Sequence, residues 1–275
     1  MRKTIFTLFI LLLGFQLQAS DGGDKYVEAM KKTLAMLDTA STVQTYQNCA
    51  NRFERIGKAE KKEWIPYYYA GMCYSLMIYS EKDMTKIDPM LDRADEYLDM
   101  ALDMKLKDFE KSEILVIKGM VAGGRIMVEP QTRSMKYGPM SGQFYQRAVN
   151  LNPENPRALS MSAQSLMYTP KQFGGGRDKA IPVMEDALVK YEAWEDPYEL
   201  FPDWGKELTE GQLEFAKSGK KAPWEEGAED DSNMEEPKKE GASEEDGSHE
   251  GHNHDHGEHG HDHDHEGHDH DGGGN

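Results

Sequence analysis

Apolar residues recur at spacings of three and four between residues 24 and 217, and no stretch shows the sustained alternation of a strand. This period places the apolar side chains on one face of a helix. Breakers such as Asp88-Pro89 and Asn152-Pro153 separate the stretches and mark helix ends. The pattern predicts nine helices, at 24–38, 43–57, 62–80, 87–105, 109–127, 137–151, 155–168, 177–192 and 203–217. Antiparallel helices with such short connections pack as a bundle or an α-solenoid, so the predicted fold class is all-α.

Two terminal segments lie outside this pattern. Residues 1–19 carry Arg2 and Lys3 before an apolar run, as in a secretory signal peptide. The run is too short to span a bilayer, and no Cys follows it closely, so no lipoprotein anchor is expected. Residues 223–275 contain 19 Asp and Glu against two Lys and almost nothing apolar, which predicts a disordered tail. We therefore expect an exported, periplasmic protein with one helical domain at 20–222.

The charge of the chain is concentrated in the tail. The whole chain has a net charge of −18, and residues 223–275 contribute −17 of it. The helical domain is consequently close to neutral and offers no basic stripe that could neutralise phosphates. A nucleic-acid partner is therefore not expected, and the domain contains no run long enough to span a membrane.

All ten histidines lie within the last 27 residues, among Asp, Glu and Gly. They are His249, His252, His254, His256, His259, His261, His263, His265, His268 and His270. Imidazole is the commonest protein ligand for divalent transition metals, and neighbouring carboxylates add oxygen ligands. The tail therefore predicts multi-site binding of Zn²⁺, with Ni²⁺ or Cu²⁺ as alternatives. Acidification through the ordinary histidine pKa of about 6.5 should release the metal. The alternative is that the acidic tail only keeps the protein soluble.

A repeated pattern of small and bulky residues marks the helical region. A small residue is followed four positions later by a bulky one and three positions after that by Ala, which lets two helices approach closely. The three copies are Ala94…Leu98…Ala101, Ser141…Tyr145…Ala148 and Ala180…Met184…Ala187. Leu151-Asn152-Pro153-Glu154-Asn155-Pro156-Arg157-Ala158 follows the second copy. On these residues the chain resembles the tetratricopeptide repeat family over roughly 43–192.

Four fragments are also similar to a group of exported repeat proteins of Bacteroidetes-type bacteria. They are Glu129-Pro130-Gln131-Thr132-Arg133 with Lys136-Tyr137, Asn155-Pro156-Arg157, Thr169-Pro170 with Phe173-Gly174-Gly175-Gly176, and Pro202-Asp203-Trp204-Gly205. This resemblance implies an α-solenoid of antiparallel helix pairs and export from the cytoplasm. It implies no particular reaction.

The helical domain lacks the residues of the common catalytic sites. It has no His, so a Ser–His or Cys–His nucleophile and a His-rich metal centre are not expected there, and we expect no enzyme. Paired carboxylates such as Asp95-Glu96 and Glu185-Asp186 are interpreted as solvated helix faces. Cys49 and Cys73 fall on neighbouring predicted helices, where either a disulfide or two buried free thiols is possible.

Four weaker features admit both a binding and a packing interpretation. Gly174-Gly175-Gly176 precedes a helix but lacks the Lys-Ser/Thr of a nucleotide loop, so a turn is favoured. The 17 Met residues include many at core spacing, which favours gap filling over Cu(I) binding. The aromatic patch Trp64-Ile65-Pro66-Tyr67-Tyr68-Tyr69 favours core packing over a ligand surface. Arg133, Lys136 and Tyr137 are expected in a loop, where they either hold a carboxylate or brace the loop.

Two functional hypotheses follow from these observations. In the first, the protein is an exported adaptor whose helical groove docks a protein partner and whose tail binds divalent transition metal for buffering or handover. In the second, it is a periplasmic scaffold or solute-binding subunit that acts through its groove. The aromatic patch and the Arg133 region would then form the site, and the tail would only solubilise the protein.

Overall fold

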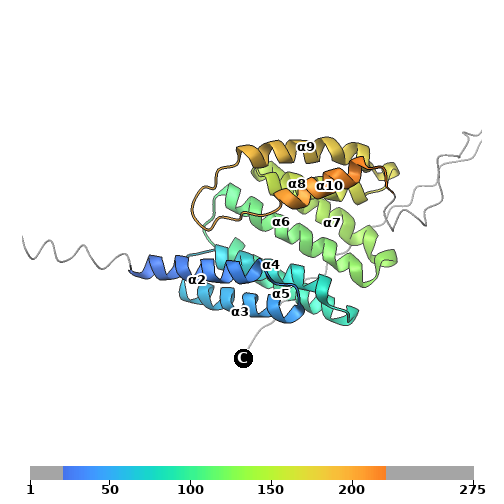
Figure 1. The fold of residues 1–275 in the computed structure, drawn as a ribbon. Coiled ribbons are helices and arrows are strands. Elements are labelled where there is room, and N and C mark those ends of the chain that lie inside the picture. The colour runs from blue at the N-terminus through green and yellow to red at the C-terminus, as the bar shows by residue number, and fades with distance from the viewer. Residues whose placement is uncertain (1–20, 221–275) are drawn as a thin grey trace, which may run out of the picture. The chain divides into compact units, whose positions relative to one another are not determined.

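The computed structural model describes residues 21–220, and all regular structure in this range is helical (Figure 1). The α-helices are α2 (Asp21–Leu37), α3 (Val43–Ala59), α4 (Ile65–Met77), α5 (Ile87–Leu102), α6 (Asp108–Gly124), α7 (Pro130–Leu151), α8 (Pro156–Tyr168), α9 (Arg177–Ala193) and α10 (Lys206–Lys217). Short 3-10 turns occur at Ile78–Ser80, Met84–Lys86, Arg125–Val128 and Lys171–Phe173. The all-α prediction is confirmed. The expected signal peptide (1–19) and the His-rich tail (223–275) lie outside the described residues.

The largest difference from the predicted helix bounds is the start of α7. The sequence predicts that this helix begins at residue 137, whereas α7 begins at Pro130. Proline fits the first turn of a helix because its φ is already helical and its missing N–H is not needed there. Pro130 is thus a helix start and not a breaker. The expectation that Arg133, Lys136 and Tyr137 lie in a loop is therefore wrong, since all three lie on α7.

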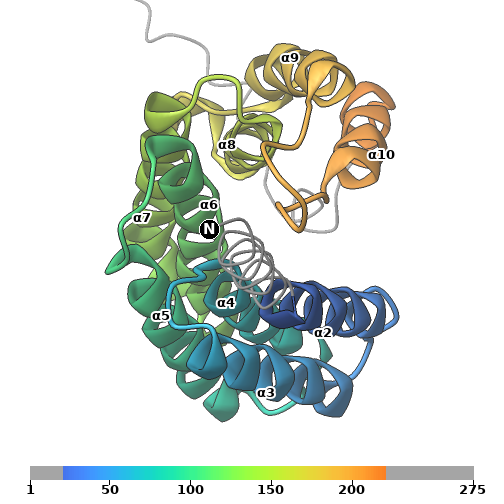
Figure 2. The ribbon, with the colours of Figure 1, turned by 90° about the vertical axis from the view of Figure 1, so that its left-hand side faces the viewer.

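Helices adjacent in the sequence pack against each other, and within the described range they follow one another along an arc (Figure 2). Helices α4, α6 and α8 lie on the inner side of this arc, and α5, α7 and α9 lie on the outer side. The inner helices also contact each other directly, α4 with α6 and α6 with α8.

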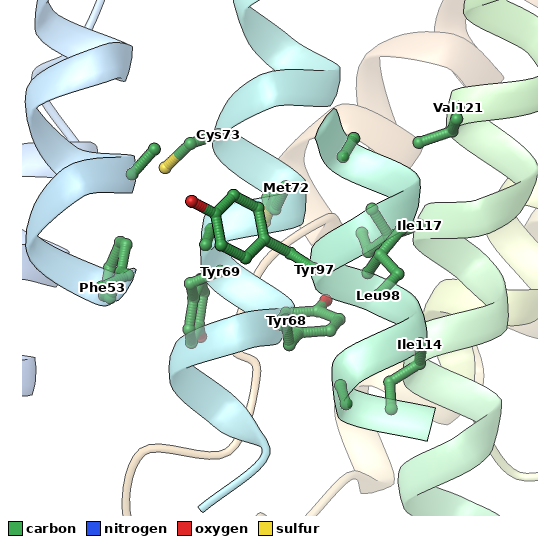
Figure 3. Close-up of a cluster of buried hydrophobic side chains, with 14 of the residues drawn as sticks. Phe53, Tyr68, Tyr69, Met72, Cys73, Tyr97, Leu98, Ile114, Ile117 and Val121 are labelled. Atoms are coloured by element: carbon green, nitrogen blue, oxygen red, sulfur yellow. The ribbon is translucent and has the colours of Figure 1, made fainter. Parts of the chain in front are cut away.

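The largest core cluster joins helices α3, α4, α5 and α6 (Figure 3). Within it, Leu98 of α5 packs on Gly71 of α4, where an added Cβ would lie 2.8 Å from the Leu98 Cγ. In the same way Tyr145 of α7 packs on Gly119 of α6, where an added Cβ would lie 2.2 Å from the tyrosine ring. In the first two copies of the repeated pattern, the bulky residue therefore fills the space over a glycine of the preceding helix. Every Ala of the pattern is fully buried, at positions 94, 101, 148, 180 and 187.

Candidate functional site

Residues 194–205, here named the crossing segment, connect α9 to α10 and return across the chain to α4. Two tryptophan–tyrosine hydrogen bonds fix this segment. The Trp64 Nε1–H donates to the Tyr198 hydroxyl at 2.9 Å, and the Trp204 Nε1–H donates to the Tyr68 hydroxyl at 2.8 Å. Each of these bonds joins residues more than 130 positions apart in the sequence. The crossing segment therefore covers part of α4 as a fixed element of the fold.

Phe201 anchors the centre of the crossing segment. Its side chain is only 3% exposed, and its ring centroid lies 5.4 to 6.2 Å from those of Trp64, Phe109, Trp194 and Tyr198. The preceding residue, Leu200, has a φ of 72°. A side chain in this left-handed region costs about 1–3 kcal/mol and persists only where surrounding packing holds it. Here the burial of the Phe201 ring offsets that strain.

A buried ion pair lies beneath the crossing segment. Arg157 of α8 donates to both carboxylate oxygens of Glu113 on α6, at 2.9 and 3.0 Å, and both side chains are almost completely buried. The guanidinium carbon of Arg157 lies 5.1 Å from the ring centroid of Trp194 and 5.7 Å from that of Phe201. Burial raises the pKa of Glu113, and the neighbouring Arg157 opposes this rise. Arg157 thus connects the body of the protein to the crossing segment.

The Asn155-Pro156-Arg157 fragment of the sequence builds this arrangement. The Asn155 side chain caps α8 by accepting from the backbone N–H groups of Arg157 and Ala158, and it donates to the Ser112 hydroxyl at 2.9 Å. This cap fixes where α8 begins and hence where the Arg157 side chain points. The fragment that carries the family resemblance therefore supports the crossing segment.

A cavity of about 330 Å³ lies beside the crossing segment, at the low end of the range of about 300–1,000 Å³ for small-molecule sites. Helices α2, α3 and α4 and the crossing segment supply its wall. The lining residues are Leu34, Leu37, Asp38, Tyr46, Tyr69, Met72, Leu76, Phe201, Asp203 and Trp204. Most of them are apolar or aromatic, two are acidic, and none is basic. We take this cavity as the candidate binding site.

The two tyrosines of the cavity remain protonated at neutral pH. Burial raises the pKa of Tyr69 well above its ordinary value; Arg157 opposes this rise, and Asp203 and Asp196 add to it. Burial also raises the pKa of Tyr46. Each phenol can therefore donate one hydrogen bond to a ligand. The indole N–H of Trp204 is already bonded to Tyr68.

The structure separates the two roles proposed for the aromatic patch at residues 64–69. Trp64, Tyr68 and Tyr69 are buried, so the packing interpretation holds for them. Tyr69 also lines the cavity, together with Trp204 from the crossing segment. The residues that sequence reasoning missed are those of the crossing segment and Tyr46. Their sequence signal was weak, because nothing local indicates that they meet α4.

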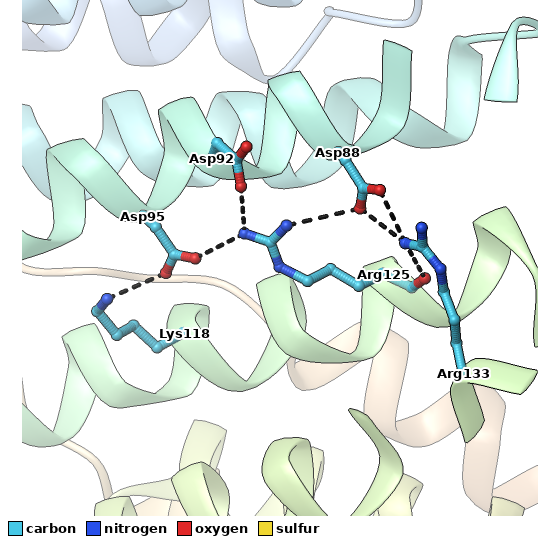
Figure 4. A network of polar contacts seen from close by, with 6 residues as sticks. All are labelled: Asp88, Asp92, Asp95, Lys118, Arg125 and Arg133. Atoms are coloured by element: carbon cyan, nitrogen blue, oxygen red, sulfur yellow. Dashed lines mark hydrogen bonds and ion pairs between the residues drawn. The ribbon is translucent and has the colours of Figure 1, made fainter. Parts of the chain in front are cut away.

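Arg133 does not line this cavity and is part of an ion-pair network that joins α5 to Lys118, Arg125 and α7 (Figure 4). Its guanidinium lies 2.8 Å from Asp88 of α5, which confirms the bracing interpretation and not carboxylate capture. Arg125 lies 2.7 Å from Asp92 and 3.0 Å from Asp95. The expectation that Asp95 belongs to a solvated face is wrong, since it also binds Lys118 at 3.0 Å. The network braces α5 against α6 and α7.

The remaining features of the sequence have structural roles. Cys49 and Cys73 are buried free thiols, so the structure contains the second of the two alternatives and not the disulfide. The three glycines at 174–176 form a turn in which Gly174 and Gly176 have φ of 84° and 107°. An added Cβ at Gly175 would lie 2.1 Å from the Thr169 carbonyl oxygen. Met72, Met77, Met161, Met167 and Met184 are buried, as the core spacing predicts, whereas Met100 is 45% exposed.

None of the predicted metal ligands lies among the residues that the structure describes, because all ten histidines are beyond residue 220. Within residues 21–220, no group of three or more His, Cys, Asp or Glu side chains could hold a metal ion. In the same range no helix is both long and apolar enough to cross a membrane.

Comparison with known proteins gives one informative similarity. The HusA haemophore from Porphyromonas gingivalis has a solved structure that matches with a TM-score of 0.64 and 32% sequence identity. The match covers 72% of this chain and 95% of that one. No family model and no curated protein matches the chain, so the tetratricopeptide resemblance rests on its residue pattern alone.

Proposed function

The chain belongs to the family of the HusA haemophore, and we propose that it is an exported protein that binds a haem-like tetrapyrrole in the cavity beside the crossing segment. The observation that carries this proposal is the aromatic wall of the cavity in a chain that aligns with almost the whole haemophore. The ligand is cargo in this proposal, and no reaction is assigned to the protein.

The chemistry of the cavity wall suits a flat, largely apolar ring. Tyr46, Tyr69, Phe201 and Trp204 offer aromatic surface, and Met72 is flexible enough to adapt to the ring edge. A tetrapyrrole is larger than the cavity, so one edge would remain in solvent. Stacking of the ring on the aromatic side chains of the wall would provide most of the affinity. Among the lining residues, tyrosine and methionine are also the types that ligate haem iron in proteins.

The first test is a titration of haem into the full chain, followed by absorbance and by quenching of tryptophan fluorescence. Tyr46→Ala removes one aromatic wall without touching the buried core, because Tyr46 is only half-buried. We expect about 3- to 10-fold weaker binding, which corresponds to an aromatic contact worth about 0.5–1.5 kcal/mol. Tyr79→Ala is the matched control, since Tyr79 is 64% exposed and does not line the cavity. Saturable binding that Tyr46→Ala leaves unchanged would place the ligand elsewhere.

We propose a second binding activity: the ten histidines between His249 and His270 bind Zn²⁺, Ni²⁺ or Cu²⁺. The density of imidazole and carboxylate groups in this segment supports it. A chain that ends at Ala222 should lose multi-site metal binding at pH 7.5, and the full chain should release metal at pH 5.5. Equal metal binding by the full chain and the truncated chain would show that the tail does not bind metal and only keeps the protein soluble.

The same truncation also separates the two proposals. Imidazole ligates haem iron, so the tail could bind haem independently of the cavity. Haem binding that survives removal of residues 223–275 and is weakened by Tyr46→Ala belongs to the cavity. Haem binding that is lost when the tail is removed belongs to the tail and not to the cavity.

Export of the protein is part of the proposal and is supported by the signal-peptide pattern of residues 1–19. A periplasmic or extracellular location would bring the cavity into contact with external tetrapyrroles. The protein partner expected in the helical groove would then be a receptor or an envelope protein that takes over the cargo.

A further inference from the structure

The charged side chains at the cavity are all acidic. Asp38, at the end of α2, and Asp203, in the crossing segment, are both exposed and both line the cavity. Two cations of the neighbouring elements already have acidic partners, and Lys32 of α2 lines a separate hollow beside Glu199 and not this cavity. Lys31 of α2 forms an ion pair with Glu199 of the crossing segment, and Arg157 lies behind the wall on Glu113.

The rest of the wall also offers little to an anion. The Trp204 N–H is bonded to Tyr68, which leaves the two phenol groups of Tyr46 and Tyr69 as side-chain hydrogen-bond donors among the lining residues. An ionised carboxylate loses much of its hydration on burial and needs a cation or several donors in return. Neither a Lys nor an Arg is present on the wall to supply that compensation.

Tetrapyrroles differ in where they carry their carboxylates. Protoporphyrin has two propionates on one edge of the ring, and its opposite edge is uncharged. Coproporphyrin has one propionate on each of its four pyrroles, and uroporphyrin has two carboxylates on each. A protoporphyrin can therefore present an apolar edge to the cavity, whereas the other two rings cannot avoid placing a carboxylate near it.

We propose that Asp38 and Asp203 are specificity-determining residues that select tetrapyrroles with one uncharged edge and orient that edge inward. The inference rests on the proposed function. The carboxylate edge then projects into solvent, away from both aspartates. This orientation leaves the carboxylates accessible to the basic groups of a receiving protein.

The test uses the full chain and metal-free porphyrins, which the imidazoles of the tail cannot ligate through iron. Fluorescence titrations at low salt measure the affinity for protoporphyrin, coproporphyrin and uroporphyrin. The wild-type chain should bind coproporphyrin at least 10-fold more weakly than protoporphyrin and should not bind uroporphyrin measurably. High salt should reduce the difference, because it screens exposed charges.

The double variant Asp38→Asn/Asp203→Asn should reduce the preference for protoporphyrin over coproporphyrin by at least threefold. Asp103→Asn/Asp186→Asn is the matched control, since it removes two exposed carboxylates away from the cavity and should leave the preference unchanged. Equal wild-type affinities for protoporphyrin and coproporphyrin would overturn the inference, as would an unchanged preference in Asp38→Asn/Asp203→Asn. A wild-type chain that binds neither porphyrin would instead overturn the proposed function.

Discussion

Removing Arg157 while leaving Glu113 in place should strongly destabilise the protein. Arg157→Met removes two charge-assisted hydrogen bonds, of 2.9 and 3.0 Å, from a carboxylate with no exposed surface. Breaking a buried pair in this way typically costs about 3–5 kcal/mol, because the remaining charge is uncompensated. The loss of the guanidinium beneath Trp194 and Phe201 adds to this cost. Urea unfolding at pH 7.5, followed by tryptophan fluorescence, measures the change.

The dependence of this cost on pH follows from the pKa of Glu113. Burial raises that pKa in the folded protein, and without Arg157 it should rise further. Between the pKa of Glu113 in the unfolded protein and its higher pKa in the folded protein, only the folded state keeps the proton on Glu113. The free energy of unfolding therefore falls as the pH rises through this interval. The cost of Arg157→Met should therefore shrink when the pH is lowered from 7.5 towards 5.

The double variant Glu113→Leu/Arg157→Met supplies the control. Replacing a whole buried ion pair with apolar side chains is often close to neutral, so the double variant should recover most of the stability lost in Arg157→Met. The reasoning is refuted if Arg157→Met costs less than about 1 kcal/mol, or if the two substitutions prove additive in a double-mutant cycle.

Two further predictions concern the core. Gly119→Ala should destabilise the protein by about 1–3 kcal/mol in thermal unfolding, because its Cβ would lie 2.2 Å from the Tyr145 ring. Gly211→Ala, where an added Cβ meets nothing within 4 Å, should not destabilise the protein. Cys49 and Cys73 should both react with Ellman's reagent in denaturant without prior reduction and stay protected in the native protein. A thiol count of zero in denaturant would show that a disulfide forms after export.

The helices could be predicted from the sequence because their signals are local. Helical periodicity and the breakers locate each helix, and the small–bulky–Ala pattern correctly predicts Leu98, Tyr145 and Met184 as buried. The one large error, the start of α7, arose because Pro130 fits both a breaker and the first turn of a helix. The two interpretations can be distinguished only from the three-dimensional contacts of the next helical turn, in which Arg133 pairs with Asp88 of α5.

The candidate site could not be predicted, because it is made by contacts between distant parts of the chain. Trp204 and Tyr68 are 136 residues apart, and Arg157 and Glu113 are 44 residues apart. A buried ion pair has no periodic signature, since each partner is indistinguishable from a surface charge in a single sequence. The Asn155-Pro156-Arg157 fragment carried the family resemblance at a junction between helices, but it did not indicate the partner of its arginine.

The crossing segment supports the proposal that the helical domain binds a small ligand and not a peptide. Inner helices of such an array normally present their side chains to a docked chain. Here Trp64, at the start of α4, donates to Tyr198, and Tyr68 of α4 accepts from Trp204. Both partners belong to the protein's own crossing segment. That part of the inner face is consequently covered by the crossing segment, and the cavity lies between this segment and helices α2, α3 and α4. A space so small and so aromatic suits the edge of a flat ring better than an extended peptide, which needs a long row of backbone and side-chain contacts.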